Sequence, residues 1–226
     1  MSLKSKLMVQ CVLSLCIAAL LLFLPAGTLH FWEAWIFLGI FLIPMMLFAA
    51  YYYKHDPALL QRRMESRENV KEQRVLMRLA TLVFAVGMIV PGLDHRFGWT
   101  NRVTNGVPLW VEISAQALAL AGYLASMWVV NVNRFAARTI RVEQGQQVIS
   151  LGPYRLVRHP MYSAMLLMWL AVSPALGSYL ALPIFALFIP VFVFRLLNEE
   201  KVLQRELPGY EEYCQKTRFR LVPHVW

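Results

Sequence analysis

Six long stretches of the chain are almost entirely apolar, and shorter polar segments separate them. A helix needs roughly 20 apolar residues to cross the hydrocarbon core of a bilayer, and most of these stretches approach or exceed that length. The pattern predicts an all-α integral membrane protein with about six transmembrane helices. Five spans are the main alternative, because the third and fifth stretches are short or interrupted. The predicted spans are residues 7–24, 31–53, 75–93, 109–130, 161–176 and 179–197.

The composition agrees with a single membrane-embedded unit. Of the 226 residues, 58% are apolar and only 15% are charged. This composition is too apolar for an ordinary soluble domain, and the chain is too short for several domains. We predict two regions within this unit. Residues 1–130 form the first four spans, and residues 131–226 form a catalytic, cofactor-binding region with a helical hairpin and C-terminal interfacial helices.

The basic residues indicate a topology. The net charge is +9, but the Lys and Arg side chains recur in alternate loops and form no continuous patch for nucleic acid. Under the six-span prediction, all 22 of them except Arg96 and Arg102 fall on one side of the membrane. Basic residues accumulate on the cytoplasmic side of inserted helices. We therefore expect both termini and the active site to be cytoplasmic, with the lipid bilayer as partner and without nucleic acid.

The last two spans are predicted to form a hairpin that joins two polar clusters. Pro160 suits the first position of a helix, because its missing N–H would be unpaired there anyway. At about 1.5 Å per residue, a helix rising from Pro160 and a second one returning to Asn198 have similar lengths. Arg158, His159 and Tyr162 should therefore lie at the same depth as the other cluster, although about forty residues separate them. The second cluster comprises Arg195, Glu199 and Glu200.

Several familiar catalytic motifs are absent from the sequence. There is no Gly-x-Gly-x-x-Gly, no P-loop, no His-Glu-x-x-His and no serine-nucleophile motif, which leaves a Rossmann cofactor domain, a nucleotide hydrolase and a zinc protease without support. The five histidines have no metal-ligand spacing, so we expect no metal.

Glu112 lies just inside the fourth predicted span. We expect it to be solvated at the membrane interface, and a functional acid is the alternative.

An ordered set of motifs gives the chain a specific resemblance. It begins with Gly-Pro-Tyr-x-x-x-Arg-His-Pro-x-Tyr at 152–162, continues with Glu199-Glu200 and Leu-Pro-Gly-Tyr-Glu-Glu-Tyr at 207–213, and ends with Arg-Leu-Val-Pro at 220–223. In these motifs, between about residues 131 and 226, the chain resembles the isoprenylcysteine carboxyl methyltransferase family, within the wider group that includes phospholipid methyltransferases. The first hundred residues carry no matching motif.

The resemblance implies an integral membrane methyltransferase that uses S-adenosylmethionine. Carboxylates suit the hydroxyl and ammonium groups of such a cofactor, and imidazole or guanidinium suits its carboxylate. Gln146 stands where eukaryotic members of the family have a histidine. The residues implied in cofactor binding are Gln146, Val148, Ile149, Gly152, Tyr154, His159, Tyr162, Glu199 and Glu200.

The expected reaction is in-line methyl transfer to a lipophilic or lipidated acceptor that arrives from the bilayer. Because a sulfonium methyl is already activated, the protein need mainly position the reactants and exclude water. The expected catalytic residues are Arg158, Arg195 and Glu200, and Asn133 and Arg195 are expected to contact the acceptor. Arginine would orient a carboxylate acceptor, whereas a glutamate would take the proton from an amine. The sequence leaves both acceptors open.

Two other functional classes compete with the methyltransferase. Membrane sterol reductases have a similar C-terminal Tyr-x-x-Tyr and Arg-x-x-Pro pattern, and they would require NADPH. A non-enzymatic membrane scaffold or small transporter is the third class, because apolar spans by themselves do not indicate an activity.

Overall fold

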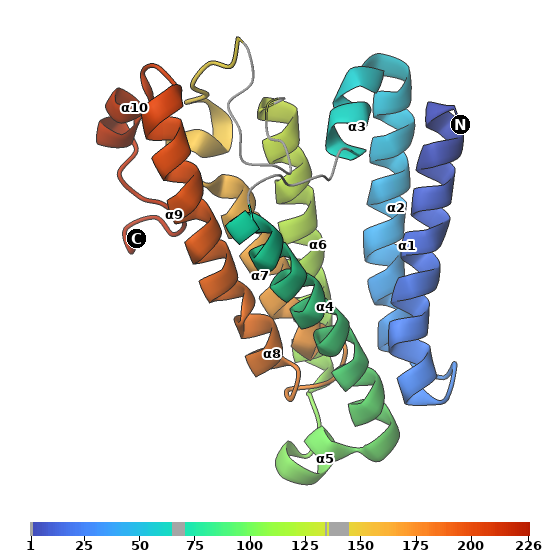
Figure 1. Cartoon of the computed structure of the whole chain (residues 1–226). Coiled ribbons are helices and arrows are strands. Elements are labelled where there is room, and N and C mark those ends of the chain that lie inside the picture. Colours follow the sequence, from blue (N-terminus) through green and yellow to red (C-terminus); the bar gives the residue numbers. More distant parts are fainter. Residues whose placement is uncertain (1, 65–70, 134, 136–144) are drawn as a thin grey trace.

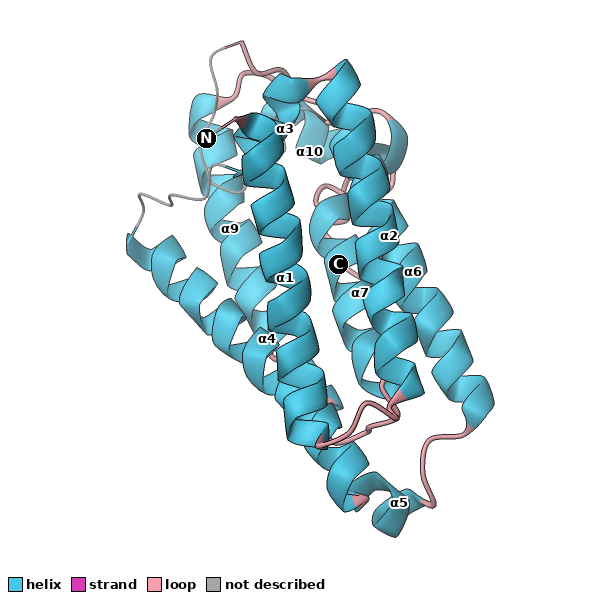
Figure 2. Ribbon diagram, turned by 90° about the vertical axis from the view of Figure 1, so that its right-hand side faces the viewer, coloured by secondary structure: helices cyan, strands magenta, loops and turns pink. Residues whose placement is uncertain are grey.

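The computed structural model describes residues 2–64, 71–133, 135 and 145–226. Within these residues every regular element is helical, and the long helices run side by side as one bundle (Figures 1 and 2). The predicted all-α architecture is confirmed. The elements are α1 (Leu3–Ala26), α2 (Trp32–His55), α3 (Pro57–Met64), α4 (Lys71–Phe97), α5 (Trp99–Thr104), α6 (Leu109–Val132), the 3-10 helix η1 (Gly152–Arg155), α7 (Pro160–Ala175), α8 (Leu182–Ala186), α9 (Phe188–Glu206) and α10 (Tyr210–Lys216).

Among the described residues, five helical segments are long and apolar enough to cross a membrane, in agreement with the lower of the two predicted counts. They lie in α1, α2, α4 and α6 and in the stretch Leu182–Glu206, which contains α8 and α9. The sixth predicted span is α7, which is apolar but has only 16 residues. At about 1.5 Å per residue, this helix is shorter than the roughly 30 Å hydrocarbon core.

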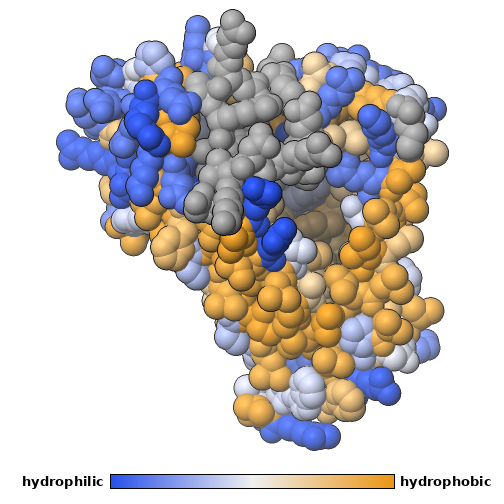
Figure 3. All heavy atoms as spheres, viewed as in Figure 1, coloured by the Kyte–Doolittle hydropathy of each residue, from blue (hydrophilic) through white to orange (hydrophobic). Residues whose placement is uncertain are grey.

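The surface of the bundle has the apolar belt of a membrane protein. Large hydrophobic side chains point outward along the long helices, among them Leu24 of α1, Leu47 of α2 and Trp110 of α6, which are 73%, 67% and 72% exposed. Figure 3 shows this hydrophobic surface around the middle of the bundle and hydrophilic residues mainly toward its upper end. A contiguous apolar surface of this extent is stable only against lipid or a partner, so the chain is an integral membrane protein.

Small residues allow the helix backbones to approach closely, as is common between helices in membranes. A Cβ atom on Gly122 of α6 would lie 2.8 Å from both Ala164 O and Met168 N of α7. Gly92 of α4 similarly faces Leu22 O of α1. Glycine at these two positions lets α6 pack along α7 and lets α4 pack along α1.

Two helix boundaries determine where the polar clusters lie. Pro160 is the first residue of α7, as predicted. The last predicted span was expected to end at Leu197, but α9 continues to Glu206. Glu199 and Glu200 therefore belong to a helix rather than to the segment that follows it. This difference matters because consecutive helical residues point about 100° apart, so the two carboxylates enter different surroundings.

A buried polar network joins the chain at the end of the bundle where α5 lies. Asp94 of α4 is 3% exposed and accepts hydrogen bonds from Thr100 N at 2.8 Å, from Ser178 Oγ at 2.5 Å and from Thr100 Oγ1. Tyr179 N in turn donates to Thr100 Oγ1 at 3.2 Å. Because both carboxylate oxygens of Asp94 have partners, this network holds the end of α4 against the turn between α7 and α8.

Candidate active site

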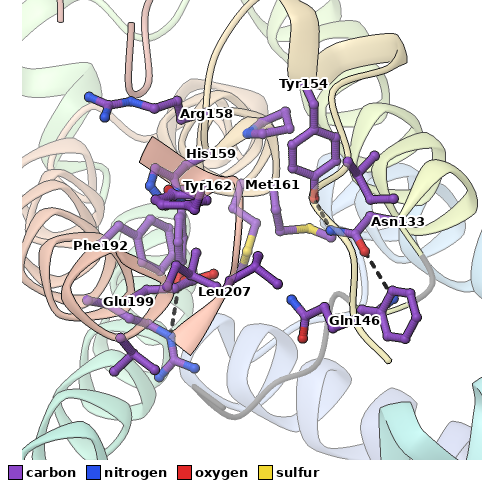
Figure 4. A pocket seen from close by; sticks show the side chains of 18 of the residues that line it. Asn133, Gln146, Tyr154, Arg158, His159, Met161, Tyr162, Phe192, Glu199 and Leu207 are labelled. Carbon is purple, nitrogen blue, oxygen red and sulfur yellow. Dashed lines mark hydrogen bonds between the residues drawn. The ribbon is translucent and has the colours of Figure 1, made fainter. Parts of the chain in front are cut away.

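A cavity of about 510 Å³ lies at the other end of the bundle, where α10 packs. Helices α4, α7, α9 and α10 contribute to its wall, as do η1 and the segment that precedes it. Figure 4 shows Asn133 and Tyr154 on one side of this cavity and Tyr162, Phe192 and Glu199 on the other. A cavity of this volume is within the usual range for small-molecule and cofactor sites.

The wall of the cavity changes from polar to apolar. Its apolar part consists of side chains from α4, α7 and α9, namely Met77, Ala80, Phe84, Met165, Trp169, Phe188 and Phe192. Its polar lining includes Arg63, Thr81, Asn133, Gln146, Gln147, Tyr154, Arg158, His159, Tyr162, Arg195, Glu199, Tyr210 and Tyr213. One continuous space can therefore receive a polar molecule next to a hydrophobic one.

The hairpin joins the two predicted clusters by direct contacts. Tyr162 Oη of α7 donates to Glu199 Oε2 of α9 at 2.7 Å, and Arg195 Nε donates to Tyr162 Oη at 3.0 Å. Arg195 Nη1 reaches back to Gln73 Oε1 of α4 at 3.3 Å. The convergence of the clusters, predicted from helix length, is thus present in the structure, and it also includes a residue of α4.

Glu200 lies beside this group but does not line the cavity. Its Oε1 pairs with Arg158 Nη1 and with His159 Nε2, both at 3.2 Å, and its Oε2 accepts from Arg220 Nε at 2.9 Å. The Glu200 side chain is 5% exposed. Both of its oxygens have cationic or imidazole partners, so this carboxylate ties α9 to the start of α7 and to the C-terminal segment.

Arg158 remains charged in this setting. Burial alone would lower its pKa, but a hydrogen bond with the Cys214 side chain and the negative charge of Glu200 raise the pKa above its ordinary value. A nearby negative charge favours the charged form of a basic group. Arg158 therefore presents a permanent positive charge to the cavity wall.

Tyr154 fixes the position of η1 against the rest of the site. Its hydroxyl accepts from Asn133 Nδ2 at 2.9 Å, and its carbonyl accepts from Tyr213 Oη at 2.8 Å. Burial raises the pKa of Tyr154 to about 12, and burial likewise raises the pKa of Tyr213 and of Tyr210. These three phenols stay protonated at neutral pH, so they act as hydrogen-bond partners rather than as bases.

Two buried polar atoms of the cavity-lining residues have no hydrogen-bond partner among the described residues. Tyr210 Oη and Arg158 Nε are buried, and neither makes a hydrogen bond within the described part of the chain. A buried polar atom without a partner costs about 1–3 kcal/mol. Their presence in the lining of one cavity indicates that its natural occupant is polar at this end.

Of the remaining predicted site residues, some line the cavity and one lies outside it. Gln146, Val148 and Ile149 line the cavity. Gly152 does not: it has φ +57°, and a Cβ there would lie 3.2 Å from Val132 Cγ2 of α6. Glycine at this position allows η1 to pack on α6. Part of the predicted inner loop, residues 134 and 136–144, lies outside the described residues.

Sequence reasoning missed several residues of the site. Gln73 of α4 is 2% exposed and contacts Arg195, and Tyr210 and Tyr213 line the cavity. The two tyrosines stand in a motif that carried the resemblance, so this signal was available. No local pattern identified Gln73, because its role depends on a contact between residues far apart in the chain.

No group of three or more His, Cys, Asp or Glu side chains among the described residues could hold a metal ion. His159, the histidine of this site, pairs with Glu200.

Comparison with known families identifies the same part of the chain. A sequence model described as phospholipid methyltransferase matches residues 110–208. Over these residues the chain matches the phospholipid methyltransferase family. The matched segment contains α6, η1, α7, α8 and α9 and ends just before α10. The predicted resemblance is confirmed for this segment, and the family match indicates a membrane methyltransferase.

Curated relatives point to two enzyme names. Probable protein-S-isoprenylcysteine O-methyltransferases of rice (Oryza sativa, subspecies indica and japonica) are 34% identical over 92 residues, or 39% of this chain and 48% of theirs. A Delta(14)-sterol reductase of mouse (Mus musculus) is 34% identical over 91 residues, or 39% of this chain and 22% of its own. The chain thus spans about half the length of the rice relatives and about a fifth of the mouse relative.

Proposed function

We propose that this protein is an S-adenosylmethionine-dependent methyltransferase whose acceptor is a lipophilic or lipidated molecule. The observation that carries the proposal is the composition of the cavity wall: unpartnered polar atoms at one end and an aromatic, apolar surface at the other. A polar cofactor and a hydrophobic acceptor need adjoining surfaces of these two kinds. The match to the phospholipid methyltransferase family over residues 110–208 supports the same reading.

The residues of the polar part fit the functional groups of this cofactor. Glu199 offers a carboxylate to hydroxyl or ammonium groups, and Arg158 and His159 suit a carboxylate. Tyr210 Oη would gain the hydrogen bond that it lacks within the protein. Val148 and Ile149 would give backbone and packing contacts. When bound, the cofactor supplies a methyl group on a positively charged sulfur, which is a strong electrophile without further activation.

The chain's own residues would then position the acceptor and keep water away. Phe84, Trp169, Phe188 and Phe192 form the surface that would receive its hydrophobic part, and excluding water strengthens electrostatic interactions inside the site. Arg195 and Asn133 would orient a carboxylate acceptor. If the acceptor is an amine, Glu199 would take its proton. Positioning of this kind contributes several kcal/mol to lowering a barrier.

The structure gives Glu200 a different proposed role from the one expected from the sequence. Because its carboxylate binds Arg158, His159 and Arg220, we infer that Glu200 positions the two residues that face the cofactor. A direct role in proton transfer would require Glu200 to abandon these contacts.

The boundary between residues 1–130 and the catalytic region stays a prediction. Helix α4 belongs to the first of these regions, and it supplies part of the cavity wall.

The charge distribution along the sequence supports a cytoplasmic location for this site and for both termini, since nearly all Lys and Arg residues fall on the predicted inner side. Cysteine-accessibility labelling from each side of sealed membranes tests this topology. A single cysteine introduced at Glu211 of α10, after replacement of the natural cysteines by serine, should react from the cytoplasmic side. Reaction from the opposite side would overturn the proposed orientation.

The decisive experiment separates the two enzyme classes by their ligands. Purified protein in detergent is titrated with S-adenosylhomocysteine and, separately, with NADPH. Binding of S-adenosylhomocysteine supports the methyltransferase. Binding of NADPH alone would favour an oxidoreductase, for which the similarity to a mouse sterol reductase is the specific observation. Incubating membranes with methyl-labelled cofactor then identifies the acceptor by the lipid or lipidated species that gains the label.

A matched pair of variants tests the location of the cofactor. Tyr210→Phe removes an unpartnered hydroxyl, so it should weaken S-adenosylhomocysteine binding several-fold without lowering the melting temperature. Tyr213→Phe removes the hydrogen bond to Tyr154 O and should cost about 1 kcal/mol of stability. Unchanged binding in the Tyr210→Phe protein would exclude the proposed contact.

A further inference from the structure

A second group of buried polar side chains lies far from the cavity, at the N-terminal ends of α2 and α6. Glu33 is in the first turn of α2, and Glu112 and Gln116 are one turn apart on α6. The three residues are only 8%, 8% and 5% exposed. The expectation that Glu112 is solvated at the membrane interface is therefore wrong, because neighbouring protein covers it.

The three side chains meet at the turn that follows α7. A Cβ atom on Gly177 would lie 3.3 Å from Glu112 Oε1 and 3.5 Å from Glu33 Oε1, so both carboxylates face the same point. Gln116 Nε2 donates to Ala175 O at 2.8 Å and to Glu33 O at 3.1 Å. These bonds hold the Gln116 carboxamide between α2 and the end of α7, beside the two carboxylates.

Oxygen atoms dominate this group, and positive charge is missing from it. Glu33 Oε2 and Gln116 Oε1 are buried and have no hydrogen-bond partner among the residues that the structure describes. In the described part of the chain, no ion pair involves Glu33 or Glu112. Two carboxylates this close repel each other, and a buried charge is costly unless it is paired. A bound proton or a bound cation would relieve this repulsion.

A shared proton would compensate only in part. It would neutralise one carboxylate and provide one donor, and it would leave the Gln116 oxygen without a partner. The first turns of α2 and α6, which hold Glu33 and Glu112, carry the positive ends of the helix dipoles. The C-terminal carbonyls of α7, including Ala175 O, carry the opposite partial charge and favour a cation.

We propose that Glu33, Glu112 and Gln116 bind a calcium-like divalent cation that fastens α2, α6 and the end of α7 together. Two carboxylates balance its charge, and all the available ligands are oxygens, which hard cations prefer. Calcium accepts six to eight oxygen ligands in flexible geometry, whereas magnesium demands a near-ideal octahedron. A site made from long side chains of two separate helices suits the more tolerant ion. This proposal is independent of the methyltransferase reaction.

Thermal unfolding of the full-length protein tests the site. Protein in detergent is first washed with a chelator, and its apparent melting temperature is then followed as CaCl₂ rises from micromolar to millimolar at constant ionic strength. We expect the melting temperature to rise by several degrees, since an ion that binds only the folded state stabilises it by mass action. Magnesium should act at least tenfold more weakly at equal concentration, and extra sodium should add nothing.

Variants and direct binding distinguish the proposal from its alternatives. Glu33→Gln and Glu112→Gln should lose the calcium response, whereas Glu206→Gln, which alters an exposed acid on α9, should keep it. Equilibrium binding of radioactive calcium should give about one ion per chain in the original protein and none in Glu112→Gln. A calcium-insensitive protein that Glu112→Gln stabilises would show that the pair shares a proton, and the cation site would be wrong. An equal response to sodium alone would also overturn it.

Discussion

Asp94 and Glu199 are acids at opposite ends of the bundle, and their surroundings differ in one instructive way. Both carboxylate oxygens of Asp94 accept hydrogen bonds, which come from Thr100 and Ser178. Glu199 accepts a hydrogen bond from Tyr162 and borders a cavity. Saturation by internal partners is typical of a group that holds the fold. A polar group that borders a cavity, and that can accept further hydrogen bonds there, is typical of a binding site.

Glu200 refines this comparison because it is adjacent to Glu199 in sequence and resembles Asp94 in its contacts. Its two oxygens are occupied by Arg158, His159 and Arg220. Two consecutive glutamates in one motif therefore belong to different classes. The variants below test this division, beginning with the one that should change the protein most.

The largest effect is expected for Glu200→Gln. Removing this charge leaves the buried Arg158 without its anionic partner, and breaking a buried ion pair typically costs about 3 kcal/mol or more. Thermal unfolding in detergent should show a clear loss of stability. Glu206→Gln on the same helix is the control and should change stability by less than about 0.5 kcal/mol. A stable Glu200→Gln protein that has lost only cofactor binding would place Glu200 with the binding residues instead.

Asp94→Asn should rank second. The asparagine amide would direct donors toward Thr100 and Ser178, which already donate, so the network should lose about 2 kcal/mol. Because Asp94 is remote from the cavity, the affinity for S-adenosylhomocysteine should stay within about twofold at a temperature where the variant is folded. Isothermal titration measures this. A tenfold loss of affinity would show that the two ends of the bundle are coupled.

Glu199→Gln should lower the affinity for S-adenosylhomocysteine and leave the stability of the protein almost unchanged. It removes a charge that the proposed cofactor site uses, and loss of one charge-assisted hydrogen bond of about 1.4 kcal/mol corresponds to a tenfold weaker affinity. Stability should hardly change, because glutamine still accepts the hydrogen bond from Tyr162. The same titration and melting measurements apply. Unaltered binding would contradict the assignment of Glu199.

The smallest effect is expected for Gln73→Leu in α4. Leucine removes the oxygen that accepts from Arg195 Nη1, which should cost about 1 kcal/mol and loosen the position of Arg195. If Arg195 orients the acceptor, the KM for the acceptor should rise while cofactor affinity stays constant. Gln73→Glu, which keeps the acceptor oxygen, should restore the original KM. Equal damage by both variants would indicate a packing role for Gln73.

Much of this architecture was readable from the sequence. The apolar stretches predicted the helices, and Pro160 predicted the start of α7. Helix length predicted that Tyr162 and Glu199 would meet, and they do. These inferences succeed because helix geometry and apolar burial in lipid are local properties of a segment. The extension of α9 to Glu206 was not predicted, because tertiary packing decides where a helix ends.

The sequence by itself determined the class of protein, the pairing of the two motifs and the resemblance to membrane methyltransferases. Only the tertiary structure decided which groups each acid contacts. It separated Glu199 from Glu200, brought Gln73 of α4 to Arg195, and buried Glu112 beside Glu33. The physical reason is that the state of a charged group depends on every group within a few ångströms of it. Those neighbours come from distant parts of the chain.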